Sequence, residues 1–203
     1  MEWLIAVPLS YPVDETTLSV SRREKAAQYQ KEDDRKRSLC AGVALDNALL
    51  HIGLRENDTA VAYTSQGKPF LPDYPEWHIS LSHSGNWAVC LLSDAPSSVD
   101  IQQYRDGSFI AIAERHFSAA ECAALQAFSP KEQQRLFFRL WCAKECVLKL
   151  RGTGLSGALS SVPVTVGETL AVDDGILGEY PMDGHQLTVV TTGQLPCTVE
   201  IIE

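Results

Sequence analysis

Short apolar runs and long helical stretches alternate along this chain. Residues 3–7 form an apolar run that is typical of a buried strand. An apolar stripe with helical spacing predicts a helix over residues 21–52, which ends before Gly53. Four strand-like segments follow, separated by clusters of Gly, Pro, Asp and Ser. They cover residues 60–64, 77–81, 87–92 and 98–101.

The second half begins with a predicted helix at residues 107–116 and then shows two S-x-x-E capping boxes. Ser118 pairs with Glu121 in the first box, and Ser129 pairs with Glu132 in the second. The second box begins a long helix that precedes Gly152 and Gly154. The strands expected after this helix cover residues 161–166, 186–191 and 198–202.

Both halves place a helix before a group of short strands, with a seam near residues 101–107. We therefore predict an α/β (α+β) protein in which one structural unit occurs twice, although the halves share no evident sequence identity. The 203 residues, 45% of them hydrophobic, are enough to form a substantial core.

Composition excludes several classes of protein. There is no apolar run of 18 residues, and the N-terminus lacks the features of a signal peptide, so we expect a cytoplasmic protein. A net charge of -9 argues against nonspecific binding to nucleic acids or anionic membranes. The six cysteines show no paired CxxC spacing, which disfavours a zinc ribbon or a disulfide framework.

Charge is concentrated in one segment of this acidic chain. Between Arg22 and Arg37 there are seven basic and four acidic residues. Such a locally basic segment favours a binding site for an anion. A solvated helix face with many ion pairs explains the pattern equally well.

The residues most indicative of chemistry lie in the long second-half helix. Helical spacing aligns Trp141, Glu145 and Lys149 on one stripe, and Lys144 lies beside it. One carboxylate and two ammonium groups within two turns would suit a site for a divalent cation and phosphate. The alternative is a surface ion pair worth only about 0.2–0.5 kcal/mol.

Three segments, the last of them in this helix, occur in a fixed order along the chain. They are Gly67-Lys68-Pro69 with Ser82-His83-Ser84, then Val99-Asp100-Ile101-Gln102, then the run from Trp141 to Lys149. This order resembles that of the larger, pseudo-dimeric phosphopantetheinyl transferases, from about Arg22 to Leu155. The resemblance implies two subdomains related by a pseudo-twofold axis, residues 1–102 and 103–203. Each would be a long helix packed on a small, mainly antiparallel sheet.

The resemblance also implies a reaction. Such enzymes transfer the 4'-phosphopantetheine arm of coenzyme A to a serine of an apo acyl or peptidyl carrier protein. The products are the holo carrier and 3',5'-adenosine bisphosphate. The implied cofactor is Mg²⁺, or Mn²⁺, and the partners are coenzyme A and the carrier. No nucleic acid or membrane is expected, and the protein is expected to be a monomer.

Site residues follow from the resemblance position by position. The metal carboxylates are Asp100 and Glu145, and Gln102 would contact the metal directly or through water. Glu145 is also the leading acceptor of the serine proton, with Lys149 as its catalytic partner at the diphosphate. The residues expected to bind coenzyme A are Arg22, Lys25, Arg37, Lys68, Pro69, Ser82, His83, Lys144 and Lys149.

The chain departs from the family pattern at two places. Gln102 replaces the second acid of the Asp-x-Glu pair, and Ser97-Ser98 stands where glycine is usual. A neutral amide predicts a weaker metal site. Glu121 stays open between a site residue and a helix cap. The rival interpretations are a noncatalytic coenzyme A-binding paralogue and a nucleotide-binding regulator. The sequence identifies neither the carrier nor its docking surface.

Overall fold

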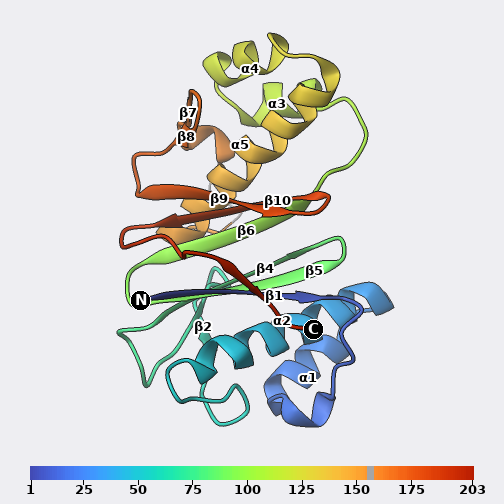
Figure 1. Ribbon diagram of the computed structural model, residues 1–203, viewed down its shortest axis with the longest axis vertical. Coiled ribbons are helices and arrows are strands. Elements are labelled where there is room, and N and C mark those ends of the chain that lie inside the picture. The colour runs from blue at the N-terminus through green and yellow to red at the C-terminus, as the bar shows by residue number, and fades with distance from the viewer. Residues whose placement is uncertain (155–157) are drawn as a thin grey trace.

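A computed structural model describes residues 1–154 and 158–203 and shows a mixed α/β fold built in layers. Helices cover the outer faces of two facing sheets (Figure 1). The first sheet has the strand order β11-β1-β5-β4, and the second has the order β6-β10-β9. Leu155, the end of the family resemblance, lies outside the described residues.

The first layers combine helices α1 (Val20–Ala27) and α2 (Glu32–Leu50) with the first sheet. Leu39, Leu45 and Leu49 of α2 are buried against Ile5 and other residues of that sheet. A fully buried side chain of this size contributes about 1.5–3 kcal/mol. The strands of this sheet are β1 (Glu2–Pro8), β4 (His78–Ser84), β5 (Trp87–Ser93) and β11 (Val199–Ile201).

The second sheet consists of antiparallel strands β6 (Ser97–Gln103), β10 (His185–Thr191) and β9 (Ile176–Met182). Its outer face packs on α5 (Pro130–Arg151), with α3 (Ile110–His116) and α4 (Ala119–Gln126) beyond it. The short elements are β2 (Ala62–Tyr63), β3 (Pro69–Phe70), β7 (Thr165–Val166), β8 (Leu170–Ala171) and the 3-10 turns Glu15–Thr17 and Leu159–Ser161.

A third apolar cluster joins the two sheets. Alternate residues of β1 and β5 face alternate residues of β6 and β10, as the period of two along a strand requires. The cluster contains Leu4, Ala6, Val89, Leu91, Val99, Ile101, Leu187 and Val189. The sheets therefore share a core instead of merely touching at a seam.

Serine side chains connect β4 to the edge of β6. The hydroxyls of Ser80, Ser82 and Ser84 accept hydrogen bonds from the backbone N–H groups of Val99, Ile101 and Gln103, at 3.1, 3.3 and 3.0 Å. These bonds satisfy donors of β6 that β10 does not reach, because β10 pairs with the other edge. Ser80 and the two serines of the S-H-S segment thereby fix β4 alongside β6.

Strand pairing bears on the predicted division of the chain. The boundary between residues 102 and 103 falls inside β6, which pairs along its whole length with β10 of the second half. In turn, β11 returns to the first sheet and pairs in parallel with β1. The mixed α/β class is confirmed, whereas the two units and their twofold relation stay predictions.

Several elements differ from expectation, and two of the differences are large. The single helix predicted over residues 21–52 is wrong, because the chain leaves α1 after Ala27 and begins α2 at Glu32. Acidic residues at the start of α2 stabilise this new N-terminus through the helix dipole. Strand β9 was not predicted. Both capping boxes are confirmed, and Gly152 ends α5 with a left-handed φ of 69°.

None of the described helices combines the length and hydropathy needed to cross a membrane.

Candidate active site

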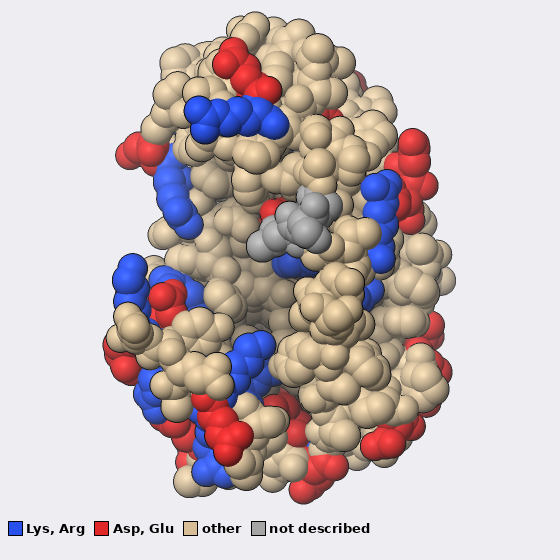
Figure 2. Space-filling view, turned by 180° about the vertical axis from the view of Figure 1, so that it is seen from behind, with Lys and Arg blue, Asp and Glu red and all other residues tan. Residues whose placement is uncertain are grey.

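A pocket of about 740 Å³ lies between the first-half and second-half elements. Its lining comes from α1, α2, the β2–β3 hairpin, β4, β6 and α5. Seen from behind, the molecule is hollowed near its middle, and Lys and Arg side chains gather along the lower rim (Figure 2). The pocket is large enough for a drug-sized or cofactor-sized ligand.

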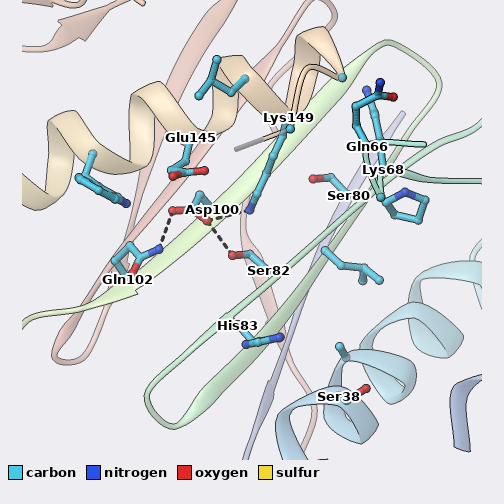
Figure 3. A pocket seen from close by; sticks show the side chains of 18 of the residues that line it. Ser38, Gln66, Lys68, Ser80, Ser82, His83, Asp100, Gln102, Glu145 and Lys149 are labelled. Carbon is cyan, nitrogen blue, oxygen red and sulfur yellow. Dashed lines mark hydrogen bonds and ion pairs between the residues drawn. The ribbon is translucent and has the colours of Figure 1, made fainter. Parts of the chain in front are cut away.

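Asp100 lies on β6 at the floor of this pocket and is only 2% exposed. Its Oδ1 accepts a hydrogen bond of 2.7 Å from the hydroxyl of Ser82 and forms a 2.7 Å ion pair with Nζ of Lys149. Its Oδ2 accepts a 3.1 Å hydrogen bond from Nε2 of Gln102. Figure 3 shows these groups converging on the carboxylate from β4, β6 and α5. Asp100 is thus held in one orientation.

Helix α5 presents to the pocket the row of residues that the sequence predicted to share one helix face. Trp141, Glu145 and Lys149 all line the pocket, because residues four apart share a helix face. Glu145 is 6% exposed, and its carboxylate faces Asp100 (Figure 3). Burial and the negative charge of Asp100 raise the pKa of Glu145 to about 7, although Lys149 opposes the shift. The two carboxylates are therefore close enough to repel each other.

These groups fit a divalent cation. Two carboxylates and one amide oxygen are hard ligands of the kind that Mg²⁺ accepts together with several waters. A cation between Asp100 and Glu145 would offset the repulsion that raises the pKa of Glu145. Within residues 1–154 and 158–203 no three His, Cys, Asp or Glu side chains come together as metal ligands. Gln102 would therefore have to act as the third protein ligand or bind through water.

Lys144 is placed differently from its prediction. It is 0% exposed, does not line the pocket, and forms a 2.9 Å ion pair with Glu121. Its Nζ also donates to the carbonyl oxygens of Leu159 and Val162. This geometry does not support the predicted contact between Lys144 and a phosphate. Adjacent residues on a helix point about 100° apart, so Lys144 does not share the pocket-facing side of Glu145.

Glu121 acts as a structural residue. It closes the capping box with Ser118, and its Oε1 accepts the backbone N–H of Val164 at 2.9 Å. Like its partner Lys144, it does not line the pocket. Of the two roles that the sequence left open for Glu121, the structure favours the cap.

Cationic residues of the first half line the opposite wall. Arg22, Lys25 and Lys68 reach the pocket, together with Pro69 and His83. The expected residues of this half are thus brought together, except Arg37, which does not line the wall. Arg37 donates to the carbonyl oxygen of Gly85 and pairs with Asp34.

Each of these cations already has a partner within the protein. Arg22 is buried beside Glu56 at 3.6 Å, and Nζ of Lys25 lies 4.5 Å from the centre of the Tyr63 ring. Nζ of Lys68 donates to the carbonyl oxygen of Leu150 at the end of α5. Desolvation and the nearby charges of Arg37 and Lys149 lower the pKa of His83, so its ring is neutral at pH 7.

Sequence reasoning missed several lining residues, among them Ser38 and three phenylalanines. Ser38 is 3% exposed, and its buried hydroxyl has no hydrogen-bond partner among the residues that the structure describes. Nothing in the local sequence distinguishes this serine from others. Phe109, Phe137 and Phe138 form a stacked and edge-on aromatic cluster beside Trp141. These residues belong to the apolar core of the second half, and one edge of that core forms the pocket wall.

Comparison with known proteins agrees with this geometry. The model of the 4'-phosphopantetheinyl transferase superfamily matches residues 96–178. A 4'-phosphopantetheinyl transferase of Bacillus subtilis is 34% identical over 176 residues, which cover 86% of this chain and 76% of the relative. The transferase Sfp of Bacillus subtilis strain 168 is 34% identical over 189 residues, with 91% and 82% covered. The transferase psf-1 of Bacillus pumilus is 32% identical over 196 residues, with 92% and 83% covered. The chain therefore belongs to the 4'-phosphopantetheinyl transferase superfamily.

Proposed function

We propose that this protein transfers the 4'-phosphopantetheine arm of coenzyme A to a serine of an apo acyl or peptidyl carrier protein. The observation that carries the proposal is the buried pair Asp100 and Glu145, with Lys149, at the end of a cationic pocket. Carboxylates and cations meet there, which suits a reaction on a metal-bound diphosphate. The relatives, all named as such transferases, support the same reaction.

The two walls of the pocket would bind different parts of the substrate and cofactor. Arg22, Lys25 and Lys68 on the first-half wall would bind the anionic and adenine end of coenzyme A. Asp100 and Glu145, with Gln102 directly or through water, would hold Mg²⁺ or Mn²⁺. The bound cation would supply neutralising charge to the diphosphate. Lys149 would add a further positive charge beside it.

Transfer forms one bond and breaks another. The carrier serine oxygen attacks the phosphorus that carries the pantetheine arm, and the bond from that phosphorus to the bridging oxygen breaks. The leaving group is 3',5'-adenosine bisphosphate. Glu145, which lines the pocket beside Asp100, would accept the serine proton directly or through water, because a general base must lie within hydrogen-bond reach of the proton. His83 and Ser82 would position the phosphates.

Incubation with an apo acyl carrier protein, coenzyme A and Mg²⁺ tests the proposal. We expect the mass of the carrier to rise by that of one phosphopantetheine group and 3',5'-adenosine bisphosphate to appear in equal amount. Addition of a chelator should stop the transfer, because the diphosphate charge is then not neutralised. Mass spectrometry of the carrier measures the transfer with and without the chelator.

The rival interpretation predicts a different outcome of this assay. A noncatalytic paralogue would bind coenzyme A but leave the mass of every carrier unchanged with Mg²⁺ and with Mn²⁺. A nucleotide-binding regulator would bind nucleotides without needing the pantetheine arm. A panel of peptidyl and acyl carriers is needed, because the docking surface for the carrier is not defined by any motif of this chain.

Replacement of Gln102 with Glu should strengthen metal binding. The change adds a third carboxylate where Nε2 of Gln102 now donates to Asp100, and ligand charge raises the affinity for divalent cations. We expect Mn²⁺ to bind about threefold more tightly or better, measured by calorimetry. A large loss of affinity in this variant would show that residue 102 does not face the cation.

Two general properties stay predictions. A monomer is expected because both halves of one chain line the pocket, and size-exclusion chromatography would test it. A cytoplasmic location is expected because coenzyme A is the proposed substrate.

A further inference from the structure

Lys149 occupies the place next to Asp100 where a bound cation would be needed. Its Nζ lies 2.7 Å from Oδ1 of Asp100 and donates to the carbonyl oxygen of Val99 at 2.9 Å. This ion pair neutralises the charge of Asp100.

Asp100 has little capacity left for a metal while this ion pair exists. A carboxylate offers about four lone-pair sites. Three donors already use them, since Ser82 and Lys149 share Oδ1 and Gln102 contacts Oδ2. A divalent cation arriving here would also meet the positive charge of Lys149, and the two charges repel each other strongly in a partly buried site.

The side chain of Lys149 can move although Asp100 and the carbonyl oxygen of Val99 hold its ammonium group. Its side chain is 29% exposed, whereas that of Asp100 is 3% exposed. Lysine is a point charge on a flexible four-carbon stem, so its ammonium can change partners without a change in the backbone. Lys149 is one of the side chains that line the pocket (Figure 3).

We propose that Lys149 is a built-in counter-ion that competes with the divalent cation for Asp100 and is drawn off by the diphosphate of coenzyme A. This inference rests on the proposed function, because the diphosphate is the anion of that reaction. This competition makes the cation and coenzyme A bind cooperatively. Each ligand raises the affinity of the protein for the other by the same factor. The protein alone binds the cation weakly, and the catalytic set of charges assembles only with substrate present.

The test measures the affinity for Mn²⁺ without coenzyme A, by calorimetry and by the paramagnetic signal of the free ion. We compare the wild-type protein with Lys149→Met and with Lys131→Met. Lys131 lies at the exposed start of the same helix and away from the pocket, so both variants change the net charge equally. Lys149→Met should bind Mn²⁺ at least about tenfold more tightly than the wild type, because the competing charge is gone. Lys131→Met should match the wild type.

Saturating coenzyme A provides the second measurement. It should raise the affinity of the wild-type protein for Mn²⁺ by a larger factor than that of Lys149→Met, because only the wild type has an ammonium to move. Equal factors in the two proteins would contradict the coupling. If Lys149→Met does not fold, as judged by circular dichroism, Lys149→Gln removes the charge with less change in polarity and serves instead.

An affinity of Lys149→Met for Mn²⁺ that equals or falls below that of the wild type overturns the inference. The carrier mass assay is independent of this result. If the wild type transfers the arm while Lys149→Met binds Mn²⁺ no more tightly than the wild type, the competition by Lys149 is contradicted. That outcome leaves the proposed function intact. If Lys149→Met binds Mn²⁺ more tightly but the wild type transfers no arm, the proposed function is contradicted. The competition between Lys149 and the cation is then still supported.

Discussion

Replacement of Glu145 with Gln should lower the rate of arm transfer at least about a thousandfold. Glu145 is the proposed proton acceptor and one of the two proposed metal carboxylates. Loss of one such group removes several kcal/mol of transition-state stabilisation, and about 1.4 kcal/mol corresponds to a factor of ten. Gln has nearly the same shape, and the carboxylate it replaces is already destabilised by burial and by Asp100. The fold should therefore be retained.

Initial rates from carrier mass spectrometry, with circular dichroism of each variant, measure this effect. Glu168→Gln is the matched control, because Glu168 is exposed and does not line the pocket. It should transfer the arm at the wild-type rate. Full activity of Glu145→Gln would exclude Glu145 both as metal ligand and as base.

Replacement of Lys144 with Met should destabilise the fold by about 3–5 kcal/mol. The variant removes one member of a buried ion pair and leaves the Glu121 carboxylate, which is 2% exposed, without its cation. It also leaves the carbonyl oxygens of Leu159 and Val162 without the donor that Lys144 supplies. The loss is a large fraction of the 5–15 kcal/mol that typically stabilises a protein.

Urea denaturation gives the free energy of unfolding for this comparison. Arg151→Met is the control, because Arg151 of the same helix pairs with Asp174 at 2.7 Å near the surface. Such exposed pairs contribute about 0–1 kcal/mol. A loss below about 1 kcal/mol for Lys144→Met would mean that Glu121 finds another partner or becomes protonated at little cost.

The fate of the two lysines of α5 shows what local sequence can and cannot predict about the site. Spacing places Lys149 within about 40° of Glu145 on the helix, and it lines the pocket as expected. Lys144 is adjacent to Glu145 in sequence but faces another side. Its place depends on Glu121 of α4 and on carbonyl oxygens that follow α5. No short-range pattern reveals such partners.

In the fold, too, features that depend on a few consecutive residues could be predicted, whereas features that depend on distant residues could not. Capping boxes and the Gly152 stop were predictable because they depend on a few consecutive residues. Strand β9 was hidden because Gly178 and Pro181 are unfavourable in strands, and Pro181 is tolerated only because β9 is an edge strand. The break between α1 and α2 has no Gly or Pro to announce it.

The parallel pairing of β11 with β1 has a consequence for synthesis on the ribosome. Residues 4–6 are translated before every other strand of the first sheet, whereas their partners, residues 199–201, are translated after all of them. Until then, one edge of the first sheet exposes unpaired backbone groups to neighbouring nascent chains. Completion of that sheet is thus postponed until β11 has been translated, after all the residues that line the pocket.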